Sequence, residues 1–419
     1  MSKPLLVYQA PVATRSGYGD HSRDILKSLY ELDKYDIKVV PTRWGTTPQT
    51  ELDEDTEFNK RVLGSIITSL DRQPDVYIQV TVANEFRRVG KFNIGITAGV
   101  ETTVAPKEFI DGCNQMDLVV TPSTFTKEVL ESTQLTEANK QTGQVIRQIK
   151  LEKPTEVLFE GVDTSVFTEK SSTSILDNVE TDFNFLFVGH WLQGDLGQDR
   201  KDVGMMIQTF CTVFKSLPKS KQPGLILKSS RAGFSVMERE AMVKSINSVT
   251  EKIGEACPPI YLVFGDLSDE EMNSLYNDDK VKAMVMFTKG EGYGRPLAEF
   301  ATTGKPIIVS KWSGHTDFLP EKFTHYLEGE LTDVHQSAQN QFLIKGSKWF
   351  TVNYSGAAKQ LNDVYAKYKD ATKKSSGLKS HITKNFSLDE MTKQLGVLLD
   401  KYIKVPEKVE LKLPEIKKL

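Results

Sequence analysis

The chain has 419 residues, of which 39% are hydrophobic, 26% charged and 9% aromatic, as in a soluble globular protein, and its length predicts two domains. A formal net charge of −3 excludes the overall basic field by which many proteins hold nucleic acid or an anionic membrane. Cys113, Cys211 and Cys257 are too few and too widely spaced for a disulfide framework or a cysteine-based metal site. No apolar segment approaches the roughly 20 residues of a membrane span, and the one at the N-terminus is too short for a signal peptide. We therefore expect a cytoplasmic protein.

Short apolar segments alternate with segments of helical period along the chain, which is typical of parallel sheets built from βαβ units. In the first half, the predicted strands span residues 5–9, 37–40, 76–80, 93–97 and 118–121. Ile25, Leu26 and Leu29 mark one face of a helix after the first strand, and another helix begins near Ser123. The first half therefore predicts one α/β domain.

The second half has the same layout, without a sequence repeat. Its predicted strands span residues 183–189, 225–228, 260–265, 283–287 and 306–310. A helix after the first of these strands has apolar residues at spacings of three and four, namely Val203, Met206, Ile207, Phe210, Val213 and Phe214. Ser268 and Glu271 form a capping box that starts a later helix. A helix near 295–303 is expected to end at Gly304.

These patterns divide the chain into three parts. We expect an N-terminal α/β domain over residues 1–175 and a C-terminal one over residues 176–385, joined through the polar segment 171–181. Ser387 and Glu390 start a last helix, so residues 386–419 are predicted to form a C-terminal helix that packs back on the first domain, followed by a charged tail.

The strongest chemical signal is a glycine-rich turn between a strand and a helix, KGEGYGRPLAEF. Gly292 and Gly294 allow a phosphate to approach the backbone closely, and the free N–H groups at the start of the helix favour an anion. Glu291 lies in the turn and Glu299 lies inside the helix. Each carboxylate can accept hydrogen bonds from hydroxyl groups, of a sugar and of a ribose. The turn therefore predicts a site for a phosphorylated sugar.

This segment resembles the E-x7-E signature of the retaining glycosyltransferases of family four (group 1), and the resemblance extends over most of the chain. It implies the GT-B fold, in which two Rossmann-like domains face each other across a cleft. It also implies that Glu291 contacts the donor sugar and that Glu299 binds the ribose. The turn residues Gly292, Tyr293, Gly294 and Arg295 would then lie against the diphosphate. The segment IYLVFGDL is similar to the family's strand that frames the base, at Gly265 and Leu267.

A second group of residues follows the first strand of the second half, in VGHWLQGDLGQDRKDVG. Fixed cations there would stabilise the negative charge of a departing diphosphate. By the resemblance, Lys201 matches the phosphate-binding lysine and Arg200 assists it, whereas His190 stands where relatives have an arginine. Lys228, at the end of the next strand, is a candidate to supply the missing charge.

The first domain offers two loops to the cleft. Gly17 and Gly19 lie in a turn that resembles the family's glycine-rich loop facing the donor, and His21 follows them either as a site residue or as an ordinary helix residue. Glu101 and Thr102 occupy the place where many relatives have a histidine near the reaction centre, so we expect them on the acceptor side.

No metal or cofactor is expected. The segment 53–55 has the spacing of a metal-binding DxD, but it lies in a polar stretch away from any strand end. The six histidines show no zinc-binding pair, and His315 either borders the site or caps a helix.

The sequence thus predicts a glycosyltransferase that takes a hexose or pentose from a nucleotide sugar, with UDP and GDP favoured, and retains its configuration. The acceptor stays open. The segment ITAGVETT looks similar to glycosyltransferases of large tailed phages, so a hydroxymethylated base in DNA is one candidate. The side chains that would help to hold such DNA are Arg87, Arg88, Lys91 and those of the lysine-rich segment 367–384. Two rival classes are a GT-B phosphorylase and a non-catalytic nucleotide-sugar-binding protein. The sequence fixes neither the sugar nor the oligomeric state.

Overall fold

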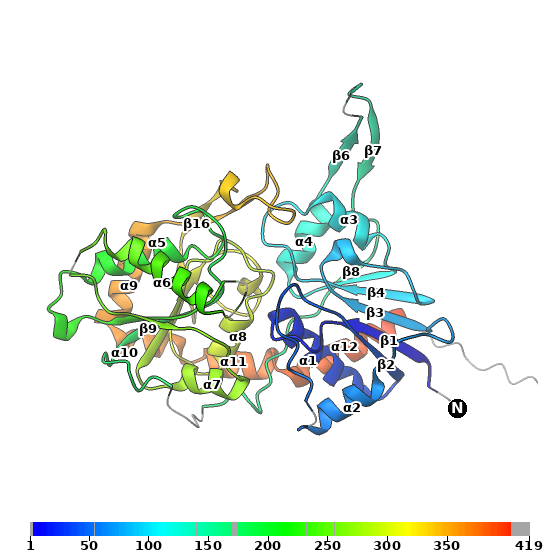
Figure 1. Ribbon diagram of the computed structural model, residues 1–419, viewed down its shortest axis with the longest axis horizontal. Helices are drawn as coiled ribbons and strands as arrows, with labels where there is room; N and C mark the ends of the chain where they lie inside the picture. Colours follow the sequence, from blue (N-terminus) through cyan, green and yellow to red (C-terminus); the bar gives the residue numbers. More distant parts are fainter. Residues whose placement is uncertain are drawn as a thin grey trace, which may run out of the picture.

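The computed structural model describes residues 3–53, 55–139, 141–169, 175–231, 233, 235–254 and 256–403. Within these residues the chain forms two α/β domains, which lie side by side in Figure 1. Each domain is built on one six-stranded sheet whose neighbouring strands are all parallel. The predicted α/β fold class is therefore confirmed.

The N-terminal sheet has the strand order β2-β1-β3-β4-β5-β8. Its strands are β1 (Leu5–Ala10), β2 (Asp36–Pro41), β3 (Val76–Val80), β4 (Phe92–Ile96), β5 (Leu118–Thr121) and β8 (Thr155–Val157). Its helices are α1 (Gly17–Leu32), α2 (Glu57–Ser65), η1 (Ala83–Glu85), α3 (Lys107–Cys113) and α4 (Thr124–Ser132). The hairpin of β6 (Leu135–Ala138) and β7 (Val145–Ile149), which was not predicted, projects from this domain (Figure 1).

The C-terminal sheet has the strand order β11-β10-β9-β12-β13-β14, which is the order of dinucleotide-binding domains. Its strands are β9 (Asn184–Val188), β10 (Gly224–Lys228), β11 (Ile260–Val263), β12 (Val281–Met286), β13 (Ile307–Ser310) and β14 (His325–Leu327). The order reverses between β9 and β12, and the carboxyl ends of these two strands mark the point where such sheets bind ligands.

Helices and a hairpin surround this second sheet. The helices are α5 (Val203–Phe214), η2 (Lys219–Lys221), α6 (Val236–Thr250), α7 (Asp269–Asn277), α8 (Arg295–Ala301), η3 (Gly314–Asp317), η4 (Gln336–Ala338), α9 (Tyr354–Ala366), α10 (Tyr368–Ser375) and α11 (Leu378–Asn385). The hairpin pairs β15 (Gly329–Asp333) with β16 (Lys348–Val352) and was not predicted, like β14. The capping box of Ser268 and Glu271 is confirmed at the start of α7.

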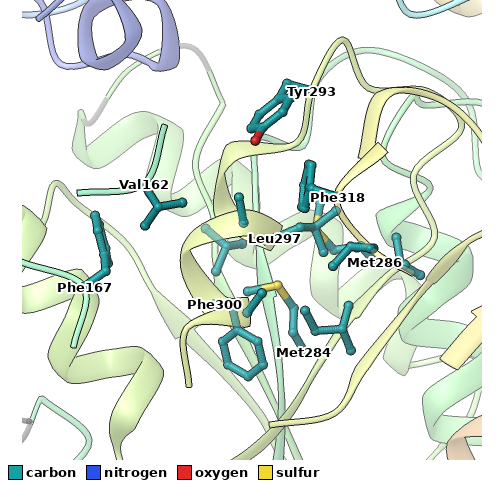
Figure 2. Packing of buried hydrophobic residues seen from close by; sticks show 14 of the residues in the cluster. Val162, Phe167, Met284, Met286, Tyr293, Leu297, Phe300 and Phe318 are labelled. Carbon is teal, nitrogen blue, oxygen red and sulfur yellow. The ribbon is translucent and has the colours of Figure 1, made fainter. Parts of the chain in front are cut away.

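Helix α8 is short and held by the core. Figure 2 shows Leu297 and Phe300 of α8 beside Met284 and Met286 of β12. Each of these four side chains is fully buried, and Gly304 just past the helix has a φ of +68°, as expected for a glycine that ends a helix. This packing fixes the glycine-rich turn that precedes α8.

Helix α12 (Leu388–Tyr402) returns to the N-terminal domain and lies against α1 (Figure 1). Ser387 starts the helix by accepting a hydrogen bond from the N–H of Glu390 at 3.3 Å, and Thr392 bonds to Ser28 of α1 at 2.8 Å. The predicted domain boundaries themselves stay a prediction. Part of the predicted join, residues 170–174, and the predicted tail from residue 404 onwards lie outside the described residues. In the described part of the chain, no helix combines the length and the hydropathy of a membrane span.

The contact of α12 with the N-terminal domain predicts a large effect for one buried methionine. Met391 is fully buried, and its side chain lies beside Gly161. We expect Met391→Ala to lower the free energy of unfolding by about 2–5 kcal/mol, because the truncation leaves a cavity. Val397 of the same helix is 69% exposed, so Val397→Ala should change it by less than about 0.5 kcal/mol. Urea unfolding of the two variants measures the difference, and equal midpoints would contradict the packing described.

Candidate functional site

The candidate site lies where the strand order of the C-terminal sheet reverses. The loop after β9 brings Arg200 and Lys201 to this place, and the turn after β12 brings Glu291. The N–H of Lys289 donates to the carbonyl of Arg200 at 2.7 Å, so the two loops are joined through their backbones.

Glu291 is the centre of a buried group of charges. Its carboxylate lies 2.5 Å from Lys201 Nζ and 3.3 Å from Arg200 Nη1, and it accepts a hydrogen bond from Thr288 at 2.6 Å. Arg200 also lies 2.9 Å from Glu101 of the N-terminal domain. Burial alone would raise the pKa of Glu291, but Lys201 and Arg200 outweigh it and hold that pKa at about 2. Glu291 is therefore ionised at neutral pH. The structure thus brings the three predicted catalytic residues, Glu291, Lys201 and Arg200, together with Glu101 from the predicted acceptor side.

His190 does not supply the cation that the sequence lacks. Burial and the charges of Lys201 and Arg200 lower the pKa of His190 below its usual value of 6.5. The ring is therefore neutral at pH 7, with Nδ1 3.0 Å from Ser230 Oγ. Lys228 has another partner, since its Nζ donates to the carbonyl of Gly265 at 2.6 Å. Gly265 has a φ of +114°, a backbone conformation that favours glycine. Leu267 lies two residues further along the chain.

Glu299 belongs to a second buried group on α8. It lies 2.8 Å from Arg295 and accepts a hydrogen bond from Tyr276 at 3.1 Å. Arg295 also forms an ion pair of 2.7 Å with Asp24, on α1 of the N-terminal domain. Arg295 thus joins the two domains. Nothing in the sequence indicated that Asp24 is its partner.

Glycines allow the two domains to touch at the turn before α8. A Cβ on Gly290 would lie 2.0 Å from the carbonyl oxygen of Glu101, and one on Gly292 would lie 2.0 Å from that of Ala98. The carbonyl of Gly292 accepts hydrogen bonds from Ser123 at 2.5 Å and Thr126 at 3.2 Å, both on the N-terminal domain. The turn is therefore fitted to the N-terminal domain atom by atom, and any larger residue would separate them.

The contacts of the remaining predicted residues of the N-terminal domain are local. Gly17 is the first residue of α1, and a Cβ on Gly19 would lie 2.1 Å from the carbonyl of Thr14. Thr102 is directed elsewhere, because its hydroxyl donates to the carbonyl of Val104 at 3.1 Å. Its buried hydroxyl serves the loop itself, so the structure does not bring the Thr102 hydroxyl into the site.

Several buried polar groups around α1 and α8 have no hydrogen bond to any of the described residues. They include both ring nitrogens of His21 and the hydroxyl of Tyr293, whose ring packs on that of Phe318 at 4.6 Å between ring centres. Burial, together with Arg295, lowers the pKa of His21 to about 4, so its ring is neutral. Unpaired buried groups of this kind carry a desolvation cost until a ligand or water bonds to them.

Glu160 is a residue of this region that the sequence did not reveal. It follows β8 at the carboxyl edge of the N-terminal sheet, and its carboxyl is buried near Arg295 and Asp24. Burial raises its pKa to about 8, so it is protonated at neutral pH. The only signal for Glu160 in the sequence is that it closely follows an apolar segment, in VLFEG.

The remaining candidates lie as follows. Among the described residues no cluster of histidine, cysteine or acidic side chains has the geometry of a metal site, and Glu54 of the segment 53–55 lies outside them. Asp53 accepts a hydrogen bond from Asn59 at 2.8 Å and serves the local turn. His315 is buried beside Gly294, with Nε2 2.7 Å from the carbonyl of Ser310, and therefore borders the site.

The fold is similar to that of solved glycosyltransferase structures. Sucrose-phosphate synthase of Thermosynechococcus elongatus superposes with a TM-score of 0.61 at 12% identity, over 95% of this chain and 98% of that one. A glycosyltransferase of Rickettsia africae gives 0.60 at 13% identity, over 96% and 100%. Anabaena HepE in complex with UDP and glucose gives 0.56 at 13% identity, over 95% and 100%. The chain therefore has the GT-B fold, two Rossmann-like domains that face each other.

Sequence comparison adds nothing to this assignment. No family model matches the chain, and no curated protein matches it. At identities of 10–14% the similarity to the solved structures establishes the fold and leaves the activity to be argued from the site.

The raised pKa of Glu160 predicts a pH-dependent effect on stability. Between about pH 4.5 and pH 8 the folded protein keeps a proton that the unfolded chain has lost, so this group opposes folding more strongly as the pH rises. Glu160→Gln removes the effect. We expect the variant to gain stability over the wild type by about 1.4 kcal/mol for each pH unit in this range. Urea unfolding at pH 5, 6.5 and 8 measures this gain, and a difference that does not change with pH would show that Glu160 is ionised.

Proposed function

We propose that this protein is a retaining glycosyltransferase that takes its sugar from a nucleotide sugar. The observation that carries the proposal is the buried contact of Glu291 with Lys201 and Arg200 at the point where the strand order of the sheet reverses. Such a donor consists of a sugar and a nucleoside diphosphate, and a pair of cations beside an ionised carboxylate can bind both the diphosphate and the sugar. The cations suit its diphosphate, and the carboxylate suits the hydroxyls of its sugar.

The solved structures of the same fold support this choice of donor. HepE of Anabaena has been solved in complex with UDP-glucose, and trehalose-6-phosphate synthase of E. coli with UDP-2-fluoro glucose. In the proposal, Glu299 binds the ribose hydroxyls, and the turn from Gly265 to Leu267 borders the base. Because Arg295 holds Glu299 in the present arrangement, the ribose would have to share that carboxylate with Arg295.

The proposed reaction exchanges one bond at the anomeric carbon for another on the same face. The bond from this carbon to the diphosphate oxygen breaks, and the acceptor oxygen bonds to the carbon, so the configuration is retained. The proton of the acceptor hydroxyl passes to the departing phosphate oxygen. Lys201 turns from Glu291 to the diphosphate and, with Arg200, stabilises the charge that develops there. In this proposal the charge is carried by side chains, and no metal ion is needed.

The acceptor in the proposal is a hydroxyl group held by the N-terminal domain, near Glu101. A hydroxymethylated base in DNA is one candidate. Arg88 and Lys91 are paired with Asp117 and Asp75. They lie at the amino edge of the N-terminal sheet, opposite the site. They would therefore give a DNA acceptor no support at the reaction centre, and sugar phosphates and other hydroxyl compounds belong in the same screen.

Donor binding is tested by a thermal-shift screen with UDP, GDP, ADP and their common sugars. A nucleotide at about 100 times its dissociation constant should stabilise the protein by about 2.7 kcal/mol. Glu299→Gln should lose this gain, whereas Glu330→Gln, at an exposed glutamate of β15, should keep it. If no nucleotide stabilises the wild type but inorganic phosphate does, the protein is a phosphorylase and the proposal is wrong.

Turnover is tested by replacing the proposed phosphate-binding lysine. We expect Lys201→Ala to lower kcat for release of the nucleoside diphosphate by about 100- to 1000-fold, because one preorganised charge is lost from the transition state. Lys215→Ala, at an exposed lysine just after α5, is the matched control. A wild type that binds the donor but never releases the diphosphate, with any acceptor or water, would be a binding protein instead of an enzyme.

A further inference from the structure

A cavity of about 630 Å³ lies in the C-terminal domain, apart from the candidate site. One wall is the loop of residues 196–198 before α5, and the other runs from the end of β15 into η4. The N–H of Asp195 donates to Ser337 Oγ at 3.0 Å and ties the two walls together. None of the described residues that line the cavity belongs to the proposed donor site.

The lining of the cavity combines an apolar surface with hydrogen-bonding groups, among them one carboxylate. Leu196, Met205 and Val334 supply the apolar surface. The polar groups are the amides of Gln198 and Gln336, the hydroxyls of Thr332, Thr351 and Tyr354, the ring of His335 and the carboxylate of Asp333. Such a lining suits the C–H face and the hydroxyl groups of a sugar ring.

The charge of the lining selects against anions. Asp333 is its only carboxylate, and no lysine or arginine is found among the described residues that form it. A phosphate or a nucleotide would meet a negative charge without a compensating cation, and a neutral ligand would not.

Two of the lining residues are bonded to a buried ion pair. The hydroxyl of Tyr354 donates to Asp202 Oδ2 at 2.7 Å, and Thr351 Oγ1 accepts from Lys289 Nζ at 3.0 Å. Lys289 and Asp202 are fully buried and lie 3.1 Å apart. The other carboxylate oxygen of Asp202 is buried and bonds to none of the residues that the structure describes, and the backbone of Asp202 has a φ of +53°, which is uncommon for an aspartate.

This ion pair adjoins the candidate site directly. Asp202 follows Lys201 in the chain, and Lys289 lies two residues before Glu291. A displacement of Tyr354 would therefore be transmitted to Lys201 through the side chain of Asp202 and the peptide bond between Lys201 and Asp202. This is a continuous chain of contacts, the physical requirement for coupling between two sites.

We propose that the cavity is a second binding site, for a neutral sugar, and that Tyr354 couples its occupancy to nucleotide binding at Lys201. The first part stands on the cavity itself. The second part rests on the proposed function, since it requires that a nucleoside diphosphate binds at Lys201.

The binding site is tested by isothermal titration calorimetry on the full chain with glucose, maltose and glucose 6-phosphate. We expect the neutral sugars to bind saturably in the millimolar range and the sugar phosphate to bind more weakly. Gln336→Trp places a large ring at the exposed rim and should weaken binding at least tenfold. Gln341→Trp, at an exposed glutamine that does not line the cavity, should bind as the wild type does.

Three results would overturn the assignment of this site. They are the absence of binding by both neutral sugars, binding of these sugars that Gln336→Trp leaves unchanged, and binding of glucose 6-phosphate that is tighter than that of glucose and is lost in Gln336→Trp.

The coupling is tested by the dissociation constant of UDP with and without a saturating neutral sugar. We expect the sugar to change it by at least fivefold in the wild type and by less than twofold in Tyr354→Phe, which lacks the hydroxyl that reaches Asp202. Equal changes in both proteins would refute the role of Tyr354. If UDP does not bind the wild type at all, the proposed function and the coupling fail together, while the calorimetry still decides whether the cavity binds sugars.

Discussion

The burial of one ionised carboxylate, Glu291, constrains the whole site. An ionised group out of water is stable only beside opposite charge and hydrogen-bond donors, and Lys201, Arg200 and Thr288 provide both. These partners come from the loops after β9 and β12, so the reversal of strand order sets their meeting point. Removing one cation would leave a buried charge uncompensated. In the proposed reaction, the diphosphate of the donor would take the place of Glu291 as the partner of Lys201.

Two ion pairs join the two domains. Arg200 reaches Glu101 and Arg295 reaches Asp24, both across the domain contact. Gly290 and Gly292 bring the backbone of the turn within reach of the N-terminal domain. Closure of a two-domain enzyme excludes water from the reacting groups, and that exclusion strengthens each charge–charge contact inside. Arg200 therefore takes part both in the charge group of Glu291 and in the contact between the domains.

Local patterns in the sequence predicted the local structure well. The strands predicted at 76–80 and 118–121 match β3 and β5 residue for residue, because a short buried strand between turns has a clear apolar signature. Glu291 and Lys201 were placed by their motifs and meet in the structure; their roles stay predictions. The pairs of Arg295 with Asp24 and of Lys289 with Asp202 could not be predicted. A charged residue shows neither its burial nor its partner in the sequence, and these partners come together only when distant elements pack. The hairpin of β15 and β16 escaped prediction because β15 is largely polar, so the first strand of the pair has no apolar pattern.

The central claim is that Lys201 leaves Glu291 to hold the diphosphate of the donor. A crystal structure of the protein with UDP tests it most directly. We expect a phosphate oxygen within about 3 Å of Lys201 Nζ, with the carboxylate of Glu291 free to face the sugar position. A structure in which UDP binds elsewhere, while Lys201 and Glu291 stay paired, would contradict it.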